Sequence, residues 1–386
     1  MGELAEIVGG GTPSTSMGSY WDGDIDWYAP AEIGEQIYLE SSQRKITEKG
    51  LNKSSAKILP IGTVLFTSRA GIGKTAILLK EGCTNQGFQS IVPNKEKLDS
   101  YFIFTRSEEL KRYGETVGAG STFAEVSGKQ MADMELMMPK TTLEQQQIGE
   151  YFSKLDHLIT LHQRKCDQMN ELKKYMLTKM FPQNGSKVPE IRFDGYTDDW
   201  EQRKLGDVCS RVQGNDGRME LPTLTISASN GWMKQEDRFS GNIAGKEQKN
   251  YTLLHKGELS YNHGNSKLAK YGTVFSLQSY EEALVPRVYH SFKVEEGNTD
   301  FIEYYFATKL PDRELGKLIS SGARMDGLLN IGYKEFMGIQ LLFPKTKEQE
   351  CIANYFRNLD NLITLHQSKC ENLKNLKKYM LRNMFV

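Results

Sequence analysis

The stretch LDHLITLHQRKCDQMNELKKYML, from Leu155 to Leu177, recurs as LDNLITLHQSKCENLKNLKKYML from Leu359 to Leu381. The two copies are 204 residues apart, because 359 − 155 and 381 − 177 give the same difference. An internal repeat states the architecture of a chain directly. We infer two copies of one unit, each of which ends in this segment.

Each copy is predicted to be a long α-helix. Apolar residues recur at steps of mostly three and four, and neither Pro nor Gly interrupts the stretch. The segments MPKTTLEQQ from Met138 and FPKTKEQE from Phe343 precede the copies, and a Thr followed by an early Glu is typical of a helix start. A helix from about Leu143 to Met180 would be roughly 55 Å long.

Matching apolar stripes predict that the two helices pair as a coiled coil. The alternative is that each helix lies separately on its own domain. His162 and Cys166 recur as His366 and Cys370. If the two helices crossed at these positions, the four side chains could form a Cys₂His₂ zinc site. We favour small side chains that fill the seam, and no metal. The residues expected to pair the helices or to dock a partner are Phe152, Leu155, Ile159, His162, Cys166, Met169, Leu172 and Met176, and then Phe356, Leu359, Ile363, His366, Cys370, Leu373, Leu376 and Met380.

Length and composition limit the class of protein. The 386 residues suffice for two or three domains, and the 49 basic residues balance the 49 acidic ones, so binding of nucleic acid would need local patches or partners. The five cysteines show no CxxC spacing, which suits a reducing cytoplasm. No apolar run of transmembrane length and no leader are evident, so a cytoplasmic protein is expected.

The repeat and the loop-rich stretch from Pro182 to Trp200 set the expected domain boundaries. The first domain is expected to be mixed α/β, with a last strand at Glu135–Met138. The first copy has no counterpart of Trp200–Lys204 and its lead-in, which indicates a late start or a truncation of the first repeat. The expected segments are 1–138 for the first domain, 139–182 for the first helix, 183–203 for a linker, 204–342 for the second domain and 343–386 for the second helix.

The middle regions of the two units share almost no side chains, which indicates one scaffold that carries two different readers. Arg and Lys suit guanine or phosphate, while Asn and Gln suit adenine edges. For each such residue the alternative is an ordinary solvated loop position. The candidate DNA-binding residues are Thr12, Ser14, Arg69, Lys74, Gln86, Gln89, Ser121, Thr122 and Lys129 in the first unit, and Asn262, Asn265, Lys267, Lys270, Arg287, Arg324 and Lys334 in the second.

SRAGIGKT, from Ser68 to Thr75, nearly spells a phosphate-binding loop, but Ser68 stands where that motif needs its first Gly. We favour a Gly-rich polar loop and keep a nucleotide-binding enzyme as the alternative. No spacing suggests a Ser/His/Asp or Cys/His set, an AdoMet-binding glycine motif, a methyltransferase catalytic loop or a nuclease signature. The chain is therefore expected to have no catalytic residues and no cofactor of its own.

The chain resembles the specificity subunits of Type I restriction-modification systems. The resemblance rests on FDGYTDDWEQRKLGDV (Phe193–Val208), on GGGTPS (Gly9–Ser14) and on the two segments of the pattern P-K-T…EQ…YF…LITLHQ…KC…LKKYML. It implies an α/β (α+β) fold with two target recognition domains, each followed by a long conserved helix. The two helices would pair as an antiparallel coiled coil with pseudo-twofold symmetry.

By the same resemblance, each domain reads one half of a bipartite, asymmetric DNA target, and helix length fixes the gap between the halves. Two modification subunits would dock on the repeated helices and bring AdoMet for adenine methylation. Restriction subunits would add cleavage driven by ATP and Mg. A coiled-coil scaffold without a role on DNA is the remaining alternative.

Overall fold

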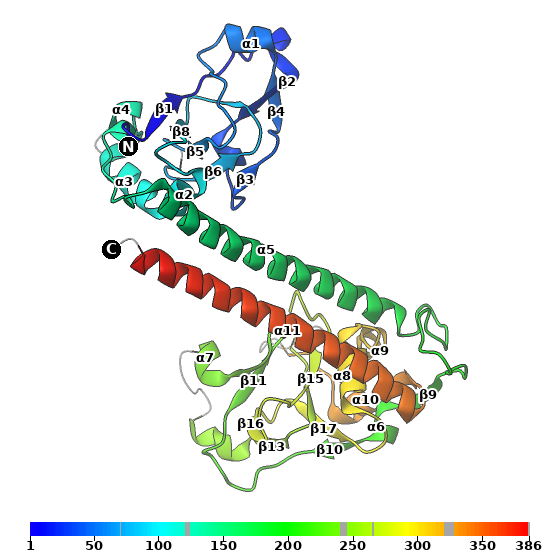
Figure 1. Ribbon diagram of the computed structural model, residues 1–386. Helices are drawn as coiled ribbons and strands as arrows, with labels where there is room; N and C mark the ends of the chain where they lie inside the picture. The colour runs from blue at the N-terminus through cyan, green and yellow to red at the C-terminus, as the bar shows by residue number, and fades with distance from the viewer. Residues whose placement is uncertain (70, 120–123, 240–244, 265, 320–327, 385–386) are drawn as a thin grey trace. The chain divides into compact units, whose positions relative to one another are not determined.

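The computed structural model describes residues 1–69, 71–119, 124–239, 245–264, 266–319 and 328–384. It divides into two compact units: unit 1 is Met1–Gln163 with Ser368–Val386, and unit 2 is Arg164–Gln367. Each unit therefore contains one mixed α/β domain and a part of both long helices, which Figure 1 labels α5 and α11.

Unit 1 is built on a five-stranded sheet in the order β1-β8-β5-β6-β3, with a smaller sheet in the order β4-β2-β7. Its elements are β1 (Ala5–Gly9), η1 (Gly18–Tyr20), β2 (Trp21–Tyr28), η2 (Pro30–Glu32), β3 (Tyr38–Leu39), β4 (Arg44–Ile46), α1 (Glu48–Asn52), β5 (Val64–Phe66), β6 (Thr75–Leu78), β7 (Cys83–Thr84), β8 (Gln89–Pro93), α2 (Ser100–Thr105), α3 (Ser107–Gly118) and α4 (Gly128–Ala132).

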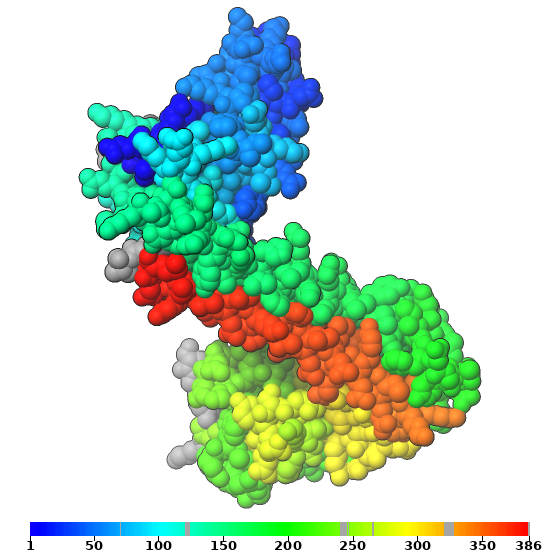
Figure 2. All heavy atoms as spheres, viewed as in Figure 1, coloured from blue at the N-terminus to red at the C-terminus, as the bar shows by residue number. Residues whose placement is uncertain are grey.

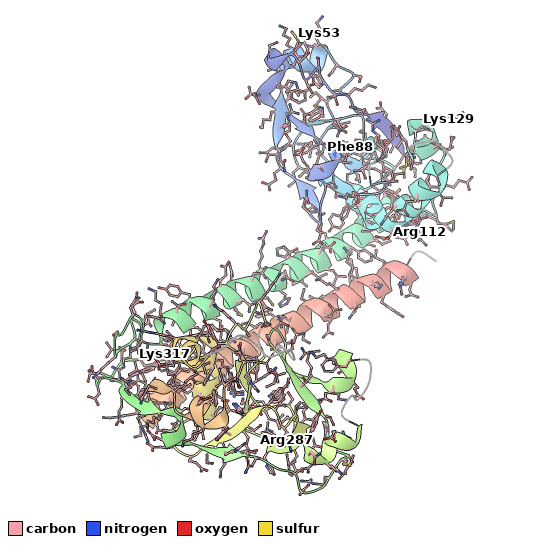
Figure 3. All side chains as sticks on the ribbon, turned by 180° about the vertical axis from the view of Figure 1, so that it is seen from behind. Lys53, Phe88, Arg112, Lys129, Arg287 and Lys317 are labelled. Atoms are coloured by element: carbon pink, nitrogen blue, oxygen red, sulfur yellow. The ribbon has the colours of Figure 1, made fainter. Side chains whose placement is uncertain are left out.

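The central strand β5 explains why the large sheet is covered on both faces. Side chains alternate along a strand, so Val64 and Phe66 point to one face and Leu65 points to the other. Val64 and Phe66 pack with Phe102 of α2 in the core under the helices, whereas Leu65 packs with Phe88 on the opposite side. All five side chains are fully buried, and Figure 3 shows Phe88 inside the domain.

Unit 2 repeats this frame with different lengths. Its elements are β9 (Glu201–Lys204), α6 (Leu205–Val208), β10 (Cys209–Val212), β11 (Leu224–Ser227), β12 (Gly231–Lys234), α7 (Gln235–Phe239), η3 (Gly245–Asn250), β13 (Thr252–His255), β14 (Leu259–Asn262), β15 (Thr273–Ser276), β16 (Glu282–Val285), β17 (His290–Val294), α8 (Thr299–Ala307), α9 (Asp312–Lys317), α10 (Tyr333–Met337) and β18 (Gln340–Phe343).

The main sheets of the two units have the same order. In unit 2 it is β10-β17-β14-β15, and in unit 1 it is β1-β8-β5-β6 followed by β3. The neighbouring strands of this common part are antiparallel in both units. The two mixed α/β domains therefore share one scaffold, as the repeat predicts.

One expected strand is absent. The prediction of a strand at Glu135–Met138 is wrong, since no strand is assigned to these residues. In unit 2 the corresponding segment is β18, which pairs antiparallel with β9. A β-strand needs a partner for its main-chain groups, and within the part of unit 1 that the structure describes nothing takes the place of β9.

The two long helices are confirmed: α5 spans Thr142–Lys179 and α11 spans Thr346–Asn383. Within unit 1, Asp156 contacts Lys377 and Ile159 contacts Cys370. Within unit 2, Asp360 contacts Lys173 and Ile363 contacts Cys166. In both units, the contacted residue number decreases along one helix as the residue number increases along the other. The helices therefore pair antiparallel in each unit.

Candidate functional site

Four loops of unit 1 are joined by hydrogen bonds at one edge of its sheets. The loop after β1 is held because Gly11 N donates to Thr84 O at 2.8 Å, and the loop after β5 because Ser68 N donates to Gly87 O at 2.8 Å. Val126 N donates to Ser68 O at 3.0 Å, which adds the segment before α4. Loops clustered on a rigid sheet are a common site of recognition.

Most candidate residues of the first unit lie on these loops. Thr12 donates a hydrogen bond to Gln86 Oε1, so the loop after β1 and the loop between β7 and β8 also meet through side chains. Arg69 lies 3.9 Å from Glu125, with 37% of its side chain exposed. Ser14, Lys74 and Lys129 are exposed, and Gln89 is half-buried at the start of β8. Figure 3 shows Lys129 at the surface. Ser121 and Thr122 lie outside the described residues.

The loop SRAGIGKT does not have the structure of a phosphate-binding loop. Such a loop connects a strand to a helix, whose N-terminus faces the phosphate. Here it connects β5 to the antiparallel strand β6, and Thr75 is already part of that strand. Gly71 and Gly73 have φ of 106° and 96°, which a tight strand-to-strand turn requires. The nucleotide-binding alternative is not favoured.

Unit 2 builds its loop cluster with a histidine. His263, which follows β14, is 6% exposed, and its ring nitrogens lie 2.7 Å from Leu329 O and 2.8 Å from Val288 O. Leu329 N donates to His263 O at 2.8 Å, as Val126 N donates to Ser68 O in unit 1. The two units thus link the same loops by the same backbone bond, but with different side chains.

The candidate residues of the second unit divide by exposure. Asn262 is held in place, because it donates to Ile226 O at 3.2 Å and accepts from Gly264 N at 3.1 Å. Lys267, Lys270, Arg287 and Lys334 are exposed, and Figure 3 shows Arg287 at the surface of unit 2. Asn265 and Arg324 lie outside the described residues. Base contacts by any of these side chains stay a prediction.

Burial also determines protonation beside this cluster. His290 stacks on His263 with ring centroids 4.9 Å apart, and its Nε2 lies 2.8 Å from Ile331 O. Burial lowers the pKa of His290 from 6.5 to about 4. The ring is therefore neutral near pH 7, and its single N–H serves the Ile331 carbonyl. The site holds its shape without a charged His290.

An exposed arginine in unit 1 is a candidate that the sequence reading missed. The guanidinium of Arg44 lies 3.7 Å above the ring of Trp21, which in turn contacts Trp27 edge-on at 5.1 Å. Stacking on an aromatic ring orders an arginine while leaving its N–H groups accessible. The two tryptophans were visible in the sequence, but the strand pairing that brings Arg44 to them was not.

The helix seam follows a strict alternation of three and four: Phe152, Leu155, Ile159, His162, Cys166, Met169, Lys173, Met176 and Met180. Of the expected stripe, Phe152, Leu155, Cys166, Phe356, Leu359, Ile363 and Cys370 are buried, and Ile159, His162, Met169, Met176, His366, Leu373 and Met380 are half-buried. Leu172 and Leu376 are 44% and 41% exposed, so they do not lie in the seam, and their expected role in docking a partner stays a prediction. The seam position belongs to Lys173 and Lys377.

Each seam lysine belongs to a three-residue cluster, which we name a node. In the unit 1 node, Asp156 accepts from Tyr101 Oη at 2.9 Å and from Lys377 Nζ at 2.6 Å. In the unit 2 node, Asp360 accepts from Tyr304 Oη at 2.8 Å and from Lys173 Nζ at 2.6 Å. Burial and the neighbouring aspartate raise the pKa of both tyrosines, so each hydroxyl remains a donor. A node ties a domain to its helix and to the opposite helix.

A second apolar stripe on the helices stays exposed. Unit 1 presents Leu158, Leu161, Leu376 and Tyr379, and unit 2 presents Leu362, Leu365, Leu172 and Tyr175. Each member of one set is 204 residues from a member of the other, since 362 − 158 and 379 − 175 give this difference. Figure 2 shows side chains of both long helices at the molecular surface. The two units thus expose equivalent apolar side chains on their long helices.

Two further searches cover the described residues. Among them, no group of three or more His, Cys, Asp or Glu side chains is placed to hold a metal ion. In the same part of the chain, no helix combines the length and the apolar character needed to cross a membrane. The thiols of Cys166 and Cys370 face main-chain carbonyls, those of Ile363 at 3.8 Å and Ile159 at 3.9 Å.

Comparison with known proteins gives a consistent result. A family described as "Type I restriction modification DNA specificity domain" matches residues 1–171 and 197–375. The chain is 32% identical over 223 residues to the Type I restriction enzyme MjaIX specificity subunit of Methanocaldococcus jannaschii, covering 55% of this chain and 51% of that protein. It is 29% identical over 166 residues to the EcoR124I/EcoR124II specificity subunit of Escherichia coli, covering 41% and 40%.

The matches span about half or less of the lengths of these two relatives. Among solved structures, the Type-I restriction-modification system S subunit from M. genitalium aligns with a TM-score of 0.57 at 12% identity, covering 98% of this chain and 96% of that one. At this identity the likeness concerns the fold alone.

Proposed function

Because this chain belongs to the family of Type I restriction modification DNA specificity domains, which matches it in two copies, we propose that it is the non-catalytic DNA-reading subunit of such a system. One observation carries the proposal: the two units share the strand order and the node, but the loops at the sheet edge carry different side chains. A common frame with two loop sets suits a bipartite, asymmetric DNA target.

The exposed loop residues have the chemistry of base and phosphate contacts. Arg69 and Gln86 in unit 1, and Arg287 and Lys267 in unit 2, carry the donors and amides that read purine edges or bind phosphate. The whole chain carries no net charge, with 49 basic and 49 acidic residues. We expect partner subunits to provide much of the phosphate binding, and with it the salt dependence.

Two modification subunits are the proposed partners. The exposed stripe recurs once in each unit, with three leucines and one tyrosine, and amphipathic helix surfaces of this kind accept helices of a partner. AdoMet would bind to those subunits, and ATP with Mg to restriction subunits. The described cysteines are all free thiols, which suits the cytoplasm, the compartment where DNA is modified.

The test is a methylation map. The chain is co-expressed with its modification subunit in a host free of adenine methylation, and genomic N6-methyladenine is sequenced. We expect one bipartite motif, of which one half changes when residues 1–138 are exchanged for another domain. A stable complex that methylates no motif would support a scaffold without a role on DNA and refute the proposal.

A single substitution then assigns one half-site to unit 1. Arg69→Ala should relax or lose one half of the motif and leave the other half intact, at a cost of about 1–3 kcal/mol in discrimination. Arg112→Ala is the matched control, because Arg112 is also an exposed arginine of unit 1 but lies on α3. Equal weakening on all sequences would make Arg69 a phosphate contact.

A further inference from the structure

The loop between β14 and β15 of unit 2, residues 263–272, carries an exposed leucine at its tip. Leu268 is 68% exposed, whereas the next residue, Ala269, is 3% exposed. Ser266 N donates to Ala269 O, and Ala269 N donates to Ser266 O, both at 3.2 Å. These two bonds close a tight turn, which has Lys267 and Leu268 as its two central residues. The turn directs the leucine away from the domain.

The base of this loop is fixed to the domain. Tyr261, which is fully buried, donates from its Oη to Tyr271 O at 2.7 Å. Gly272 has a φ of 83°, and a Cβ at this position would lie 2.5 Å from Asn262 O. The two sides of the loop can approach this closely because glycine has no side chain. Leu268 therefore stands on a support that holds its place.

A comparison with unit 1 shows that Leu268 is not the residue that anchors the loop. In the corresponding loop, which joins β5 to β6, Ile72 is half-buried and packs on the core. It lies against α3, where a Cβ at Gly114 would be 2.9 Å from Ile72 Cγ2. In unit 2 Tyr271 has this place, since a Cβ at Gly316 of α9 would be 3.3 Å from its ring. Leu268 is thus an additional apolar side chain.

Cations stand on both sides of the leucine. Lys267 and Lys270 are exposed, and within the described residues neither forms an ion pair. Lys270 Nζ lies 5.2 Å from the centre of the Tyr271 ring, a contact that leaves its charge uncompensated. A single exposed leucine needs no explanation by itself. A leucine on a fixed tip between two uncompensated lysines has the chemistry to enter the base stack of a duplex while the lysines bind phosphates.

We propose that Leu268 inserts between two stacked base pairs of the half-site that unit 2 reads, and that Lys267 and Lys270 bind the phosphates on either side. Apolar side chains of this size act as wedges that unstack one base step and bend the duplex. The energy of such a deformation depends on the sequence of the step, so Leu268 adds specificity there without a hydrogen bond to a base. The inference rests on the proposed function, because it concerns the DNA bound by the same loops.

The first experiment uses the complex of the whole chain with its modification subunits, and a duplex that contains the mapped motif. The half that stays unchanged when residues 1–138 are exchanged is the unit 2 half. Base analogues whose fluorescence rises on unstacking, 2-aminopurine for adenine and pyrrolocytosine for cytosine, are placed one at a time in and next to this half. We expect a rise at one step besides the methylated adenine, and Leu268→Ala should abolish only this rise.

Two further variants separate a wedge from a general loss of binding. Leu268→Met keeps a long apolar side chain and should retain the rise. Val188→Ala is the matched control, because Val188 is another exposed aliphatic residue of unit 2, at 38%, and lies outside this loop. The fluorescence at the methylated adenine, which a methyltransferase takes out of the stack, should respond equally in all these proteins.

A second measurement places an abasic nucleotide at the responding step. It removes stacking that a wedge must overcome, so the native complex should bind this duplex roughly tenfold or more tightly than the intact one, and the Leu268→Ala complex should show no such preference.

Three results would overturn the inference. They are the absence of a rise at any step besides the methylated adenine, an equal preference of both complexes for the abasic duplex, and a weaker binding of Leu268→Ala without unstacking, which would make Leu268 a contact to a base edge such as the thymine methyl group. In each of these cases the native complex still methylates its motif, so the proposed function stands. A native complex that methylates no motif refutes the proposed function and this inference together.

Discussion

Replacing Asp156 by alanine should destabilise unit 1 more than the equivalent replacement of Asp360 destabilises unit 2. In each node the aspartate accepts one bond from a domain tyrosine and an ion pair from a lysine of the opposite helix. The nodes differ in their exposure to water: the side chains of Asp156 and Lys377 are 10% and 25% exposed, and those of Asp360 and Lys173 are 37% and 26% exposed.

The expected magnitudes follow from this difference in burial. Asp156→Ala leaves the buried Tyr101 hydroxyl without its acceptor, which costs about 1–2 kcal/mol, and removes a mostly buried partner of Lys377, which adds roughly 1–2 kcal/mol because the lysine can still reach some water. We therefore expect about 2–4 kcal/mol in unit 1. The pair of Asp360 is more solvated, so Asp360→Ala should cost roughly 1–2 kcal/mol, most of it from Tyr304.

The assay must report on each unit separately, because a chain of two units does not unfold in one step. Native-state hydrogen exchange of the most protected amides in β5 and β14 gives the two stabilities. A double-mutant cycle with Lys377→Met isolates the Asp156–Lys377 term, and Glu171→Ala is the control for loss of an exposed acid. Equal losses in the two units, or a loss below about 1 kcal/mol for Asp156→Ala, would refute the reasoning from burial.

Three other predictions concern pH, the partner surface and the stacked arginine. His290 has its pKa lowered from 6.5 to about 4; the unfolded chain binds the proton more readily, so unit 2 should lose up to roughly 3 kcal/mol as pH falls through this window. The free energy of unfolding is measured against pH for the native chain and for His290→Gln. The variant should not show the loss of stability at low pH, and an equal loss in both proteins would contradict this prediction. Leu362→Asp combined with Leu365→Asp should weaken binding of a modification subunit about tenfold or more in a pull-down titration, without changing the thermal midpoint, because both leucines are already 44% and 47% exposed; an unchanged affinity would exclude this surface. Arg44→Ala should lower the affinity of the assembled complex for DNA and reduce the slope of log affinity against log salt by about one, whereas an unchanged slope would show that Arg44 makes no phosphate contact.

The helices and the two-unit organisation could be predicted from the sequence because their signals are local. The period of the apolar residues predicts α5, Thr142–Lys179, to within one residue at each end, and the repeat places α11, Thr346–Asn383, within the expected segment 343–386. The position of Leu172 outside the seam has a definite origin. The sequence analysis selected an apolar residue at every turn, whereas strictly alternating steps of three and four place Lys173 in the seam. The charge of Lys173 is compensated there by an ion pair with Asp360.

The loop clusters could not be assembled from the sequence, since their members are joined by bonds between distant strands. Val126 reaches Ser68, and Leu329 reaches His263, through backbone groups that any residue carries. The resemblance of SRAGIGKT to a phosphate-binding loop is not reflected in the structure, because its glycines form a turn between two antiparallel strands. The expected strand at Glu135–Met138 failed for a related reason: its residues suit a strand, but a strand forms only where a partner lies beside it.

The composition of unit 1 from the first 163 residues and the segment 368–386 has a consequence for synthesis on the ribosome. Leu373, Met380 and Leu381 pack on the same core as Phe152 and Leu155. At about 5–20 residues per second, these residues follow the rest of unit 1 by roughly 10–40 s. During that interval a nascent first domain waits with part of its core open to water, while the entire second domain is translated. The domain that is made first is therefore the one that finishes last, and a chaperone has its longest opportunity to act there.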